Sequence, residues 1–412
     1  MTGRRRVRML ALLGVTAAFF VAGCSGGGGE QGGSPTATIV SDLPLQGSSR
    51  PQNETIVNAI QLAIEQRNNM AGDVQIKYQS QDDATAQAGK WDEAKCAQNA
   101  QSVAQNEEIV GWIGPFNSGC AQVQIPILNQ AGLAMVSPAN TYIGLTKTGG
   151  EPDEPEKFYP TGNRNYTRVI VADDKQGRAG AIWMRDLGVR SVYILDDQET
   201  YGKGLADQFQ QNAEEQGIQI LGREGIDGKA SNYRALMSKI AQSNPDAIYF
   251  GGITQNNAGQ LVKDKVGAGM ANEDVSFMGP DGINEDAFID AAGNSAEGVY
   301  VTFAGLPSSA LPSKGQDFVQ QYKDKYGSDV EALTAYGYEA ANVLLDAIDR
   351  AYKADGKVTR EGVVRELFAT RNYDGVLGTW SFDENGDTTL TQLSGQRVRN
   401  GKFGFDRTID VA

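Results

Sequence analysis

The stretch Ile109-Val110-Gly111-Trp112-Ile113-Gly114-Pro115-Phe116-Asn117-Ser118-Gly119-Cys120 holds the pattern on which the fold prediction rests. Residues 109–113 form a short apolar run of the kind found in buried strands. Gly114-Pro115 ends that run, and the loop after it carries polar side chains. A short helix is predicted next, before another apolar strand at 134–136. A buried strand, a polar loop and a helix in this order are typical of parallel α/β sheets.

The same alternation extends along the chain in both directions. In the first half, strands are predicted at 37–40, 74–78, 109–113 and 134–136, and one helix is predicted through Trp91, Ala94, Ala97, Ala100 and Val103. A polar, Pro-rich interruption at 149–160 separates this series from a second one. Two similar lobes are therefore expected, which agrees with a chain too long for one hydrophobic core.

The second series and the last third of the chain complete the predicted elements. Strands are predicted at 191–195, 218–221, 247–250, 275–278 and 378–382, and helices at 177–187, 203–216, 231–243, 256–269, 313–326, 334–354 and 359–369. Residues 383–387 are predicted to form a turn.

The N-terminus has the features of an export signal. Four arginines precede an apolar run, which ends in Val21-Ala22-Gly23-Cys24 and resembles the lipobox of bacterial lipoproteins. An uncleaved anchor is the alternative, but residues 9–22 are too few for a bilayer, which takes about 20. The prediction is a signal peptide at 1–23, a lipid on Cys24 that holds the chain at the outer side of the cell membrane, and a flexible Gly- and Ser-rich tether at 24–35.

Charge limits the partners of the exported chain. Removing residues 1–23 takes away four arginines and no acids, leaving 33 basic against 51 acidic side chains, a net charge of −18. A surface this acidic repels nucleic acid and anionic lipid. No nucleic-acid partner is therefore expected.

The chain contains no histidine, and this excludes several kinds of chemistry. Ser-His-Asp and Cys-His catalysis, histidine metal sites and imidazole pH switches are all ruled out. The acidic pairs Asp173-Asp174 and Asp196-Asp197 lie at loop or strand ends, where solvated acids are ordinary. No catalytic activity, cofactor or metal is expected.

Cysteine usage fits an exported protein. With Cys24 assigned to lipid, Cys96 and Cys120 remain, and in an oxidising compartment such a pair indicates a disulfide. Two buried thiols are the alternative.

Three polar loops follow predicted strands, where open α/β sheets bind ligands. They are residues 114–120, 137–141 and 279–282. Ser118 and Thr141 can donate hydroxyl hydrogen bonds to a carboxylate, and Asp281 can accept from an ammonium group. Together they could hold a zwitterion. Helix capping by Ser118 and Thr141, and a turn at Asp281, are the alternatives that spacing alone leaves open.

Four motifs carry a resemblance to a known family. They are Ile113-Gly114 with Asn117-Ser118, Met135-Val136-Ser137-Pro138-Ala139-Asn140-Thr141, Asp197 with Tyr201-Gly202-Lys203-Gly204-Leu205-Ala206, and Phe277-Met278-Gly279-Pro280-Asp281-Gly282. In this order they resemble the type I periplasmic binding proteins, and within them the leucine/isoleucine/valine-binding proteins of ABC importers. The similarity runs from about Thr36 to about Asp387.

The resemblance implies an α/β fold with two Rossmann-like lobes, each with a parallel-type central sheet flanked by helices. Three hinge crossovers would join the lobes. It assigns residues 36–162 and 303–378 to the N-terminal lobe, and 163–302 and 379–412 to the C-terminal lobe. The family's cysteine pair, at a similar separation, also favours the Cys96–Cys120 disulfide.

The resemblance also implies a ligand site between the lobes. Ser118, Ala139 and Thr141 would hold the ligand carboxylate, with Asn140 beside them, while Tyr201, Asp281 and Gly282 would close from the second lobe, Asp281 facing the amino group. Asn117 belongs to the first of these loops, and Phe116 would supply an apolar wall. Gln52 and Ile253 stand where the branch has tyrosines, and Arg50 with Gln52 would make the side-chain pocket more polar.

The function implied is that of a lipid-anchored substrate-binding protein. It would capture an amino acid, branched-chain or a related small zwitterion, by hinge closure and deliver it as a monomer to an ABC permease with its ATPase subunits. The alternative is a ligand-sensing receptor or regulator that uses the same clamp for an amide or another small polar metabolite.

Overall fold

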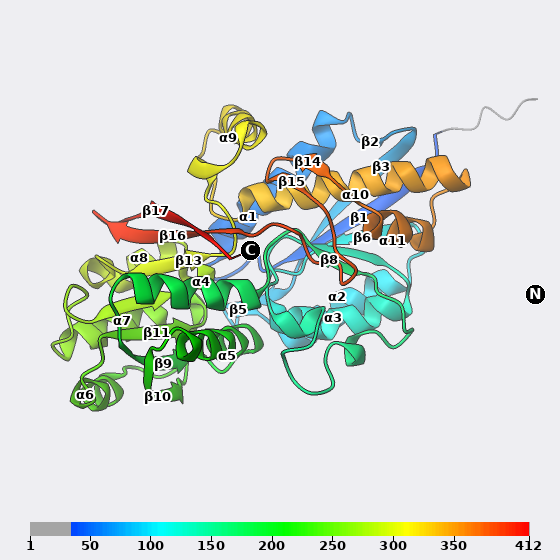
Figure 1. The fold of residues 1–412 in the computed structure, drawn as a ribbon. Coiled ribbons are helices and arrows are strands. Elements are labelled where there is room, and N and C mark those ends of the chain that lie inside the picture. The colour runs from blue at the N-terminus through cyan, green and yellow to red at the C-terminus, as the bar shows by residue number, and fades with distance from the viewer. Residues whose placement is uncertain (1–33, 412) are drawn as a thin grey trace, which may run out of the picture. The chain divides into compact units, whose positions relative to one another are not determined.

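The computed structural model describes residues 34–411 and contains two large sheets flanked by helices (Figure 1). The predicted signal peptide, Cys24 and the tether up to residue 33 lie outside the described residues. Within residues 34–411, no helix has both the length and the apolar composition needed to cross a membrane.

The first sheet has the strand order β2-β3-β1-β6-β7-β8 and is parallel except for the short edge strand β2. Its strands are β1 (Thr36–Leu43), β2 (Met70–Ala71), β3 (Val74–Asp82), β6 (Ile109–Ile113), β7 (Ala134–Ser137) and β8 (Tyr166–Arg168). Side chains of β7 alternate between its two faces: Val136 joins the core under α1 and α10, and Met135 joins the core under α2 and α3. Both faces are therefore buried, as a parallel sheet requires.

Five helices cover this sheet, and we call the whole assembly the first lobe. They are α1 (Arg50–Gln66), α2 (Glu93–Ala104), α3 (Ser118–Gln130), α10 (Thr334–Asp355) and α11 (Arg360–Phe368). Helix α9 (Ser313–Tyr326) lies against α1 through a hydrogen bond from the Tyr326 hydroxyl to the Asn58 carbonyl, 2.9 Å long. The hairpin of β14 (Tyr373–Gly375) and β15 (Gly378–Trp380) lies against α10.

The second sheet, with its helices, forms what we call the second lobe. Its order is β10-β9-β11-β12-β13-β16-β17; β16 is antiparallel to its neighbours β13 and β17, and the other strands are paired in parallel. The elements are β9 (Ser191–Asp196), β10 (Gln219–Gly225), β11 (Ala247–Gly251), β12 (Ser276–Gly279), β13 (Tyr300–Phe303), β16 (Gln392–Arg399), β17 (Lys402–Asp410), α4 (Asp173–Asp186), α5 (Thr200–Glu215), α6 (Arg234–Gln242), α7 (Ala258–Gly267) and α8 (Asp286–Ala292). On β11, Tyr249 stacks on Phe209 of α5, while Phe250 joins the core under α7 and α8.

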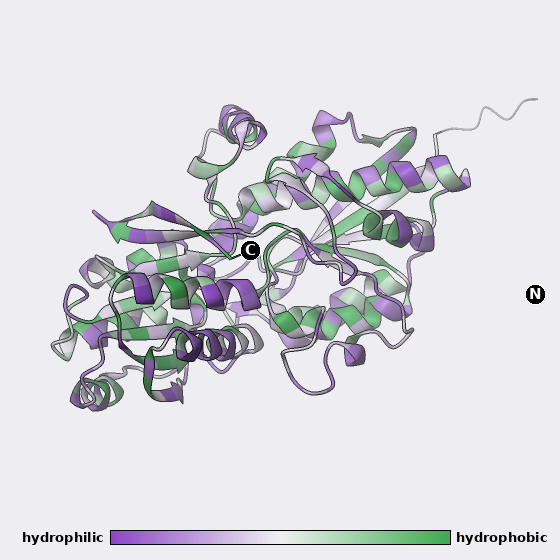
Figure 2. Ribbon diagram, viewed as in Figure 1, coloured by the Kyte–Doolittle hydropathy of each residue, from purple (hydrophilic) through white to green (hydrophobic). Residues whose placement is uncertain are grey.

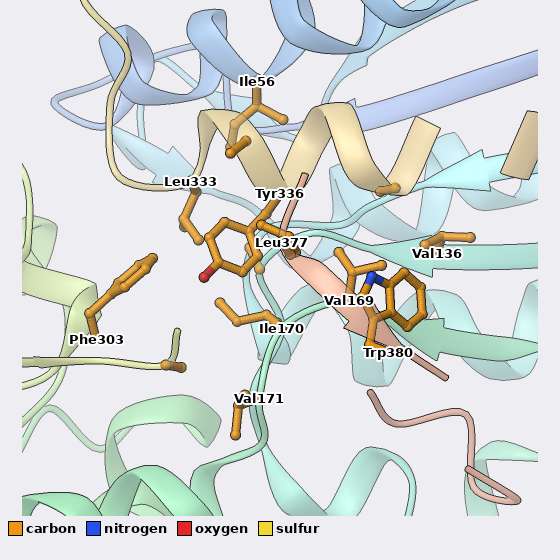
Figure 3. Close-up of a cluster of buried hydrophobic side chains, with 14 of the residues drawn as sticks. Ile56, Val136, Val169, Ile170, Val171, Phe303, Leu333, Tyr336, Leu377 and Trp380 are labelled. Atoms are coloured by element: carbon orange, nitrogen blue, oxygen red, sulfur yellow. The ribbon is translucent and has the colours of Figure 1, made fainter. Parts of the chain in front are cut away.

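The chain passes from one sheet to the other after β8, after β13 and after β15. Apolar side chains at these passages share one core (Figure 3). Tyr336 of α10 lies edge-on to Phe303 at the end of β13, with ring centroids 5.6 Å apart, and Ile170 follows β8 nearby. Because of this shared core, apolar packing at the three passages holds the two lobes together.

The helices around both sheets carry polar residues as well as apolar ones (Figure 2).

The predicted strands are confirmed at 36–43, 74–82, 109–113, 134–137, 191–196, 219–225, 247–251 and 276–279. The predicted helix through Trp91 is wrong at its start. The Asp92 side chain accepts a hydrogen bond from Lys95 N, 3.0 Å, and this cap begins α2 at Glu93. Lys90 and Trp91 instead form β5 (Lys90–Trp91), which pairs with β4 (Ala84–Thr85) in a small hairpin.

Several titratable side chains are buried in the lobes. Asp42 of β1 accepts a hydrogen bond from Asn99, and Glu339 of α10 accepts one from Trp380 Nε1, 2.7 Å. Burial raises the pKa of each carboxyl group to about 7. Lys265 donates to the carbonyl of Met270, 2.7 Å, and burial lowers its pKa to about 7.

A disulfide joins α2 to α3. Cys96 and Cys120 are both fully buried, and their sulfur atoms are 2.01 Å apart. The bond closes a loop with a sequence separation of 24 residues. Because α3 starts at Ser118, the disulfide fixes the helix that carries a predicted ligand residue.

Replacing both cysteines, Cys96→Ala with Cys120→Ala, is expected to lower the free energy of unfolding by about 3 kcal/mol, the chain-entropy value for a loop of this size. Urea unfolding with and without reductant measures the change. Reductant should destabilise the wild-type protein and leave the double variant unaffected. Equal stability of the two proteins without reductant would contradict a structural role for the bond.

Candidate functional site

Two of the predicted ligand loops lie side by side at the carboxyl ends of β6 and β7, because these strands are parallel neighbours. Ser137 Oγ donates to the Pro115 carbonyl, 3.0 Å, and Asn140 Nδ2 donates to the Phe116 carbonyl, 2.9 Å. The Ser137 hydroxyl also accepts from the backbone N–H of Ala139, 3.1 Å. These bonds hold the loops at 114–118 and 137–142 in one arrangement.

The hydroxyl of Ser118 faces the neighbouring loop. Ser118 is the first residue of α3, and its Oγ accepts from Tyr142 N, 3.4 Å, so it does not act as the cap of its own helix. Thr141 is also buried, and its carbonyl accepts from Asp173 N, 2.8 Å. The first-lobe loop is thus bonded to the start of α4 in the second lobe.

In the second lobe, residues from distant parts of the chain come together: Tyr201 lies in the first turn of α5, and Asp281 and Gly282 lie just after β12. The Tyr201 hydroxyl donates to Asp281 Oδ1, 2.7 Å, and accepts from Gly282 N, 3.2 Å. Gln176 Nε2 donates to the same carboxylate oxygen, 2.6 Å. Ile253 packs here as well: a Cβ on Gly282 would lie 2.6 Å from the Gly252 carbonyl and 3.1 Å from the Ile253 side chain. Gly282 is therefore required by close approach.

Asp173 is a site residue that the sequence analysis missed. It is fully buried at the start of α4, and its carboxyl group faces the Thr141 side chain without a hydrogen bond of good geometry among the described residues. Burial raises its pKa well above the usual value; the Thr141 side chain opposes this shift, and the charge of Asp281 adds to it. Gln176 Oε1 and the Tyr249 hydroxyl are likewise buried and unpartnered. Buried polar groups without partners are rare, so this group can accept and donate hydrogen bonds to a ligand.

The acidic pairs prove to be mostly buried, which corrects the expectation that they are solvated. Asp197 is 6% exposed and accepts from the backbone N–H of Ile253, 3.1 Å, and from Asn256 Nδ2, 2.8 Å. Burial, followed by the charge of Glu199, raises its pKa to about 7. Only Asp174 behaves as expected, pairing with Lys147 at 2.9 Å. Sequence gives no signal for this, because burial depends on loops distant along the chain.

The remaining predicted residues are less well connected to the site. Gln52 is buried in the first turn of α1, and no hydrogen bond among residues 34–411 joins its side chain to Ser118, Thr141 or Asp281. Arg50 pairs with Glu54 at 2.6 Å on the exposed side of that turn. Phe116 is partly buried against the main core, and Asn117 precedes α3 without a side-chain cap.

A model of the periplasmic binding protein family matches residues 38–402, which is most of the chain. The chain belongs to the periplasmic binding protein family. This membership confirms the predicted α/β fold and indicates an extracytoplasmic location. The family consists of binding proteins and is not a family of enzymes. The clustering of buried polar groups at the strand ends fits such a binding role.

Two relatives whose names state the amino acids that they bind place the chain more closely. It is 27% identical over 387 residues to Leu/Ile/Val-binding protein homolog 2 of Brucella abortus (strain 2308), covering 91% of this chain and 95% of that protein. The leucine binding protein LivK of Thermotoga maritima is similar in structure, with a TM-score of 0.79 and 27% identity, covering 91% of this chain and 99% of that one. These similarities confirm the predicted branch.

One further solved structure has a similar fold but a different kind of ligand. An ABC transporter solute binding protein from R. palustris, in complex with benzoate, has a TM-score of 0.73 at 18% identity and covers 92% of this chain and 98% of that one. At that identity the similarity shows the fold alone. The ligand of the present chain must be argued from its own site residues.

Asp173→Asn is expected to raise the free energy of unfolding of the ligand-free protein by about 1 kcal/mol at pH 8, and by much less at pH 4. The folded-state pKa of Asp173 lies above its ordinary value of 3.8, so the folded protein keeps a proton that the unfolded chain loses. Stability therefore falls as pH rises between the two pKa values, and asparagine removes that loss. Chemical denaturation at pH 4, 6 and 8 measures the difference.

The matched control is Asp174→Asn, which removes the adjacent carboxylate that pairs with Lys147. This variant should gain no stability at pH 8. An equal gain for Asp173→Asn at pH 4 and pH 8 would show that its ionisation is not the cause.

Proposed function

We propose that the chain is a lipid-anchored, extracytoplasmic substrate-binding protein that captures an amino acid between its lobes and delivers it to an ABC permease. The observation that carries the proposal is the hydrogen bond between Asp173 N and the Thr141 carbonyl, 2.8 Å. It brings the loop that carries the Ser118 and Thr141 hydroxyl groups next to the buried carboxyl group of Asp173. One end of this arrangement suits a carboxylate and the other an ammonium group.

The first-lobe residues suit the ligand carboxylate. Ser118, Ala139 and Thr141 supply hydroxyl and backbone N–H donors, and Asn140 holds their loop in place through Phe116. No lysine or arginine is needed for this task. Arg168, which lies behind the loop, is bonded to Asp387 at 2.7 Å and to the Tyr142 carbonyl at 2.8 Å.

The second-lobe residues suit the ligand ammonium group. Asp281, positioned by Tyr201 and Gln176, would accept from it, and Asp173 would provide a second carboxylate. Gly282 permits the close approach of these loops. The side-chain pocket would be formed by Phe116 and Ile253, with Asn117 and Gln52 at its edge, and this mixture favours a branched-chain or related small amino acid.

The mechanism is hinge closure. A ligand that contacts both lobes stabilises the closed state by its greater affinity for it, and the permease with its ATPase subunits recognises that state. The lobes would comprise residues 36–162 with 303–378, and 163–302 with 379–412. Lipid on Cys24 would hold this monomeric chain near the permease and raise its local concentration there.

Asp281→Ala is expected to weaken amino-acid binding by at least about 100-fold while the protein stays folded, because the ammonium group loses its charged acceptor. Titration calorimetry on the purified chain measures the affinity, and circular dichroism checks the fold. Asp290→Ala, an exposed acid nearby on α8, is the control and should bind as the wild type does. Undiminished affinity of Asp281→Ala would remove that residue from the site.

Thermal unfolding with a panel of ligands tests the class of substrate. Leucine or isoleucine at 100 times its dissociation constant should add about 2.7 kcal/mol to the free energy of unfolding. Benzoate, which lacks an ammonium group for Asp173 and Asp281, should have no effect. Stabilisation by benzoate with no response to any amino acid would overturn the amino-acid assignment.

A further inference from the structure

The hairpin of β4 and β5 makes a charged contact between the lobes. It lies between β3 and α2 in the first lobe, and its Lys90 Nζ donates to Glu199 Oε1 of the second lobe. The same ammonium group donates to Asn256 Oδ1, 2.7 Å. Trp91 Nε1 donates to the other oxygen of Glu199, 3.1 Å. Two consecutive residues of the first lobe thus bind one carboxylate of the second.

On the first-lobe side, this hairpin is fixed to the ligand loop. A Cβ on Gly119 would lie 2.5 Å from the ring of Trp91, so the indole packs directly on the first turn of α3. Gly119 follows Ser118, a proposed carboxylate ligand. The position of Trp91 is therefore coupled to the loop that would hold the ligand, although Trp91 is not a proposed ligand residue.

On the second-lobe side, Glu199 and Asn256 flank Asp197. The Asp197 carboxylate accepts from Glu199 N, 3.1 Å, from Ile253 N, 3.1 Å, and from Asn256 Nδ2, 2.8 Å. These bonds hold the start of α5, which carries Tyr201, next to the loop that carries Ile253. The groups that Lys90 contacts are thus the groups that fix the second half of the ligand site.

We infer that Lys90 and Trp91 form a closure latch: positioning residues that set ligand affinity by stabilising the contact between the lobes, without touching the ligand. This rests on the proposed function for the part that concerns affinity. The latch itself is a property of the two lobes and acts with or without ligand. Opening the lobes would separate Lys90 from both Glu199 and Asn256 at once.

The exposure of the contact gives it a useful strength. The side chains of Lys90 and Glu199 are 25% and 20% exposed, so this ion pair is partly buried. A contact that changes affinity about tenfold corresponds to about 1.4 kcal/mol. A contact of that size shifts the equilibrium towards the closed state while leaving it reversible, and salt weakens it.

The test uses Lys90→Met, which keeps the length of the side chain and removes its charge. Amino-acid affinity is expected to fall about tenfold, mainly through faster dissociation, while circular dichroism shows that the variant is folded. Trp91→Phe keeps a ring on Gly119 but loses the Nε1 donor, and about a threefold loss is expected. Glu199→Gln combined with Lys90→Met should be no worse than Lys90→Met alone.

A second measurement needs no ligand. Small-angle X-ray scattering of the ligand-free full chain should give a larger radius of gyration for Lys90→Met than for wild type, and high salt should enlarge the wild type alone. Lys77→Met, at an exposed lysine of β3 outside the ion pairs found in residues 34–411, is the control and should change nothing.

The two measurements separate the latch from the amino-acid assignment. If no amino acid binds the wild type, the scattering comparison still decides whether Lys90 holds the lobes together. If Lys90→Met matches the wild type in radius of gyration at low salt, the latch is overturned whatever the ligand is. Scattering that changes while affinity stays the same would limit the latch to the ligand-free protein and refute its role in affinity.

Discussion

Arg168 makes the interaction on which the arrangement of the site depends. It is fully buried at the end of β8, and its guanidinium donates to Asp387 Oδ1, 2.7 Å, and to the carbonyl of Tyr142, 2.8 Å. A buried charge that loses its partner costs several kcal/mol, so the ligand loop, the last strand of the first sheet and the segment before β16 are held together. The site cannot change shape locally without disturbing this pair.

The same pairing determines the charge of the site. Because Asp387 and two backbone carbonyls satisfy Arg168, it forms no ion pair with Asp173 or Asp281, although its charge lowers the pKa of Asp173. Asp281 is hydrogen-bonded to Tyr201 and Gln176, but neither acid has an ion-pair partner within residues 34–411, and burial disfavours their charged forms until a cationic group reaches them. Selectivity for a cationic group therefore depends on the pairing of Arg168 with Asp387 as well as on Asp173 and Asp281 themselves.

The sequence was sufficient for most of the fold because the strands of a parallel sheet are buried on both faces and appear as short apolar runs. The polar loops after 109–113 and 134–136 were predictable for the same reason, since parallel strands end at one edge. Asp173 was not, because it looks like any acid at a loop end and is buried by residues that are distant along the chain, among them Thr141 and Asp281. Trp91 was misplaced because its apolar character fits a helix face, whereas Asp92 caps the helix after it.

The absence of histidine does not make the chain indifferent to pH near neutrality. Burial brings the pKa of Asp42, Asp197, Glu339 and Lys265 to about 7. The three carboxyl groups cost stability as pH rises towards 7, and Lys265 restores it as pH rises above 7, so the contribution of these four groups is least favourable near neutrality. The pH outside the cytoplasm varies. These four buried side chains bind and release protons in the pH range in which histidine side chains usually do.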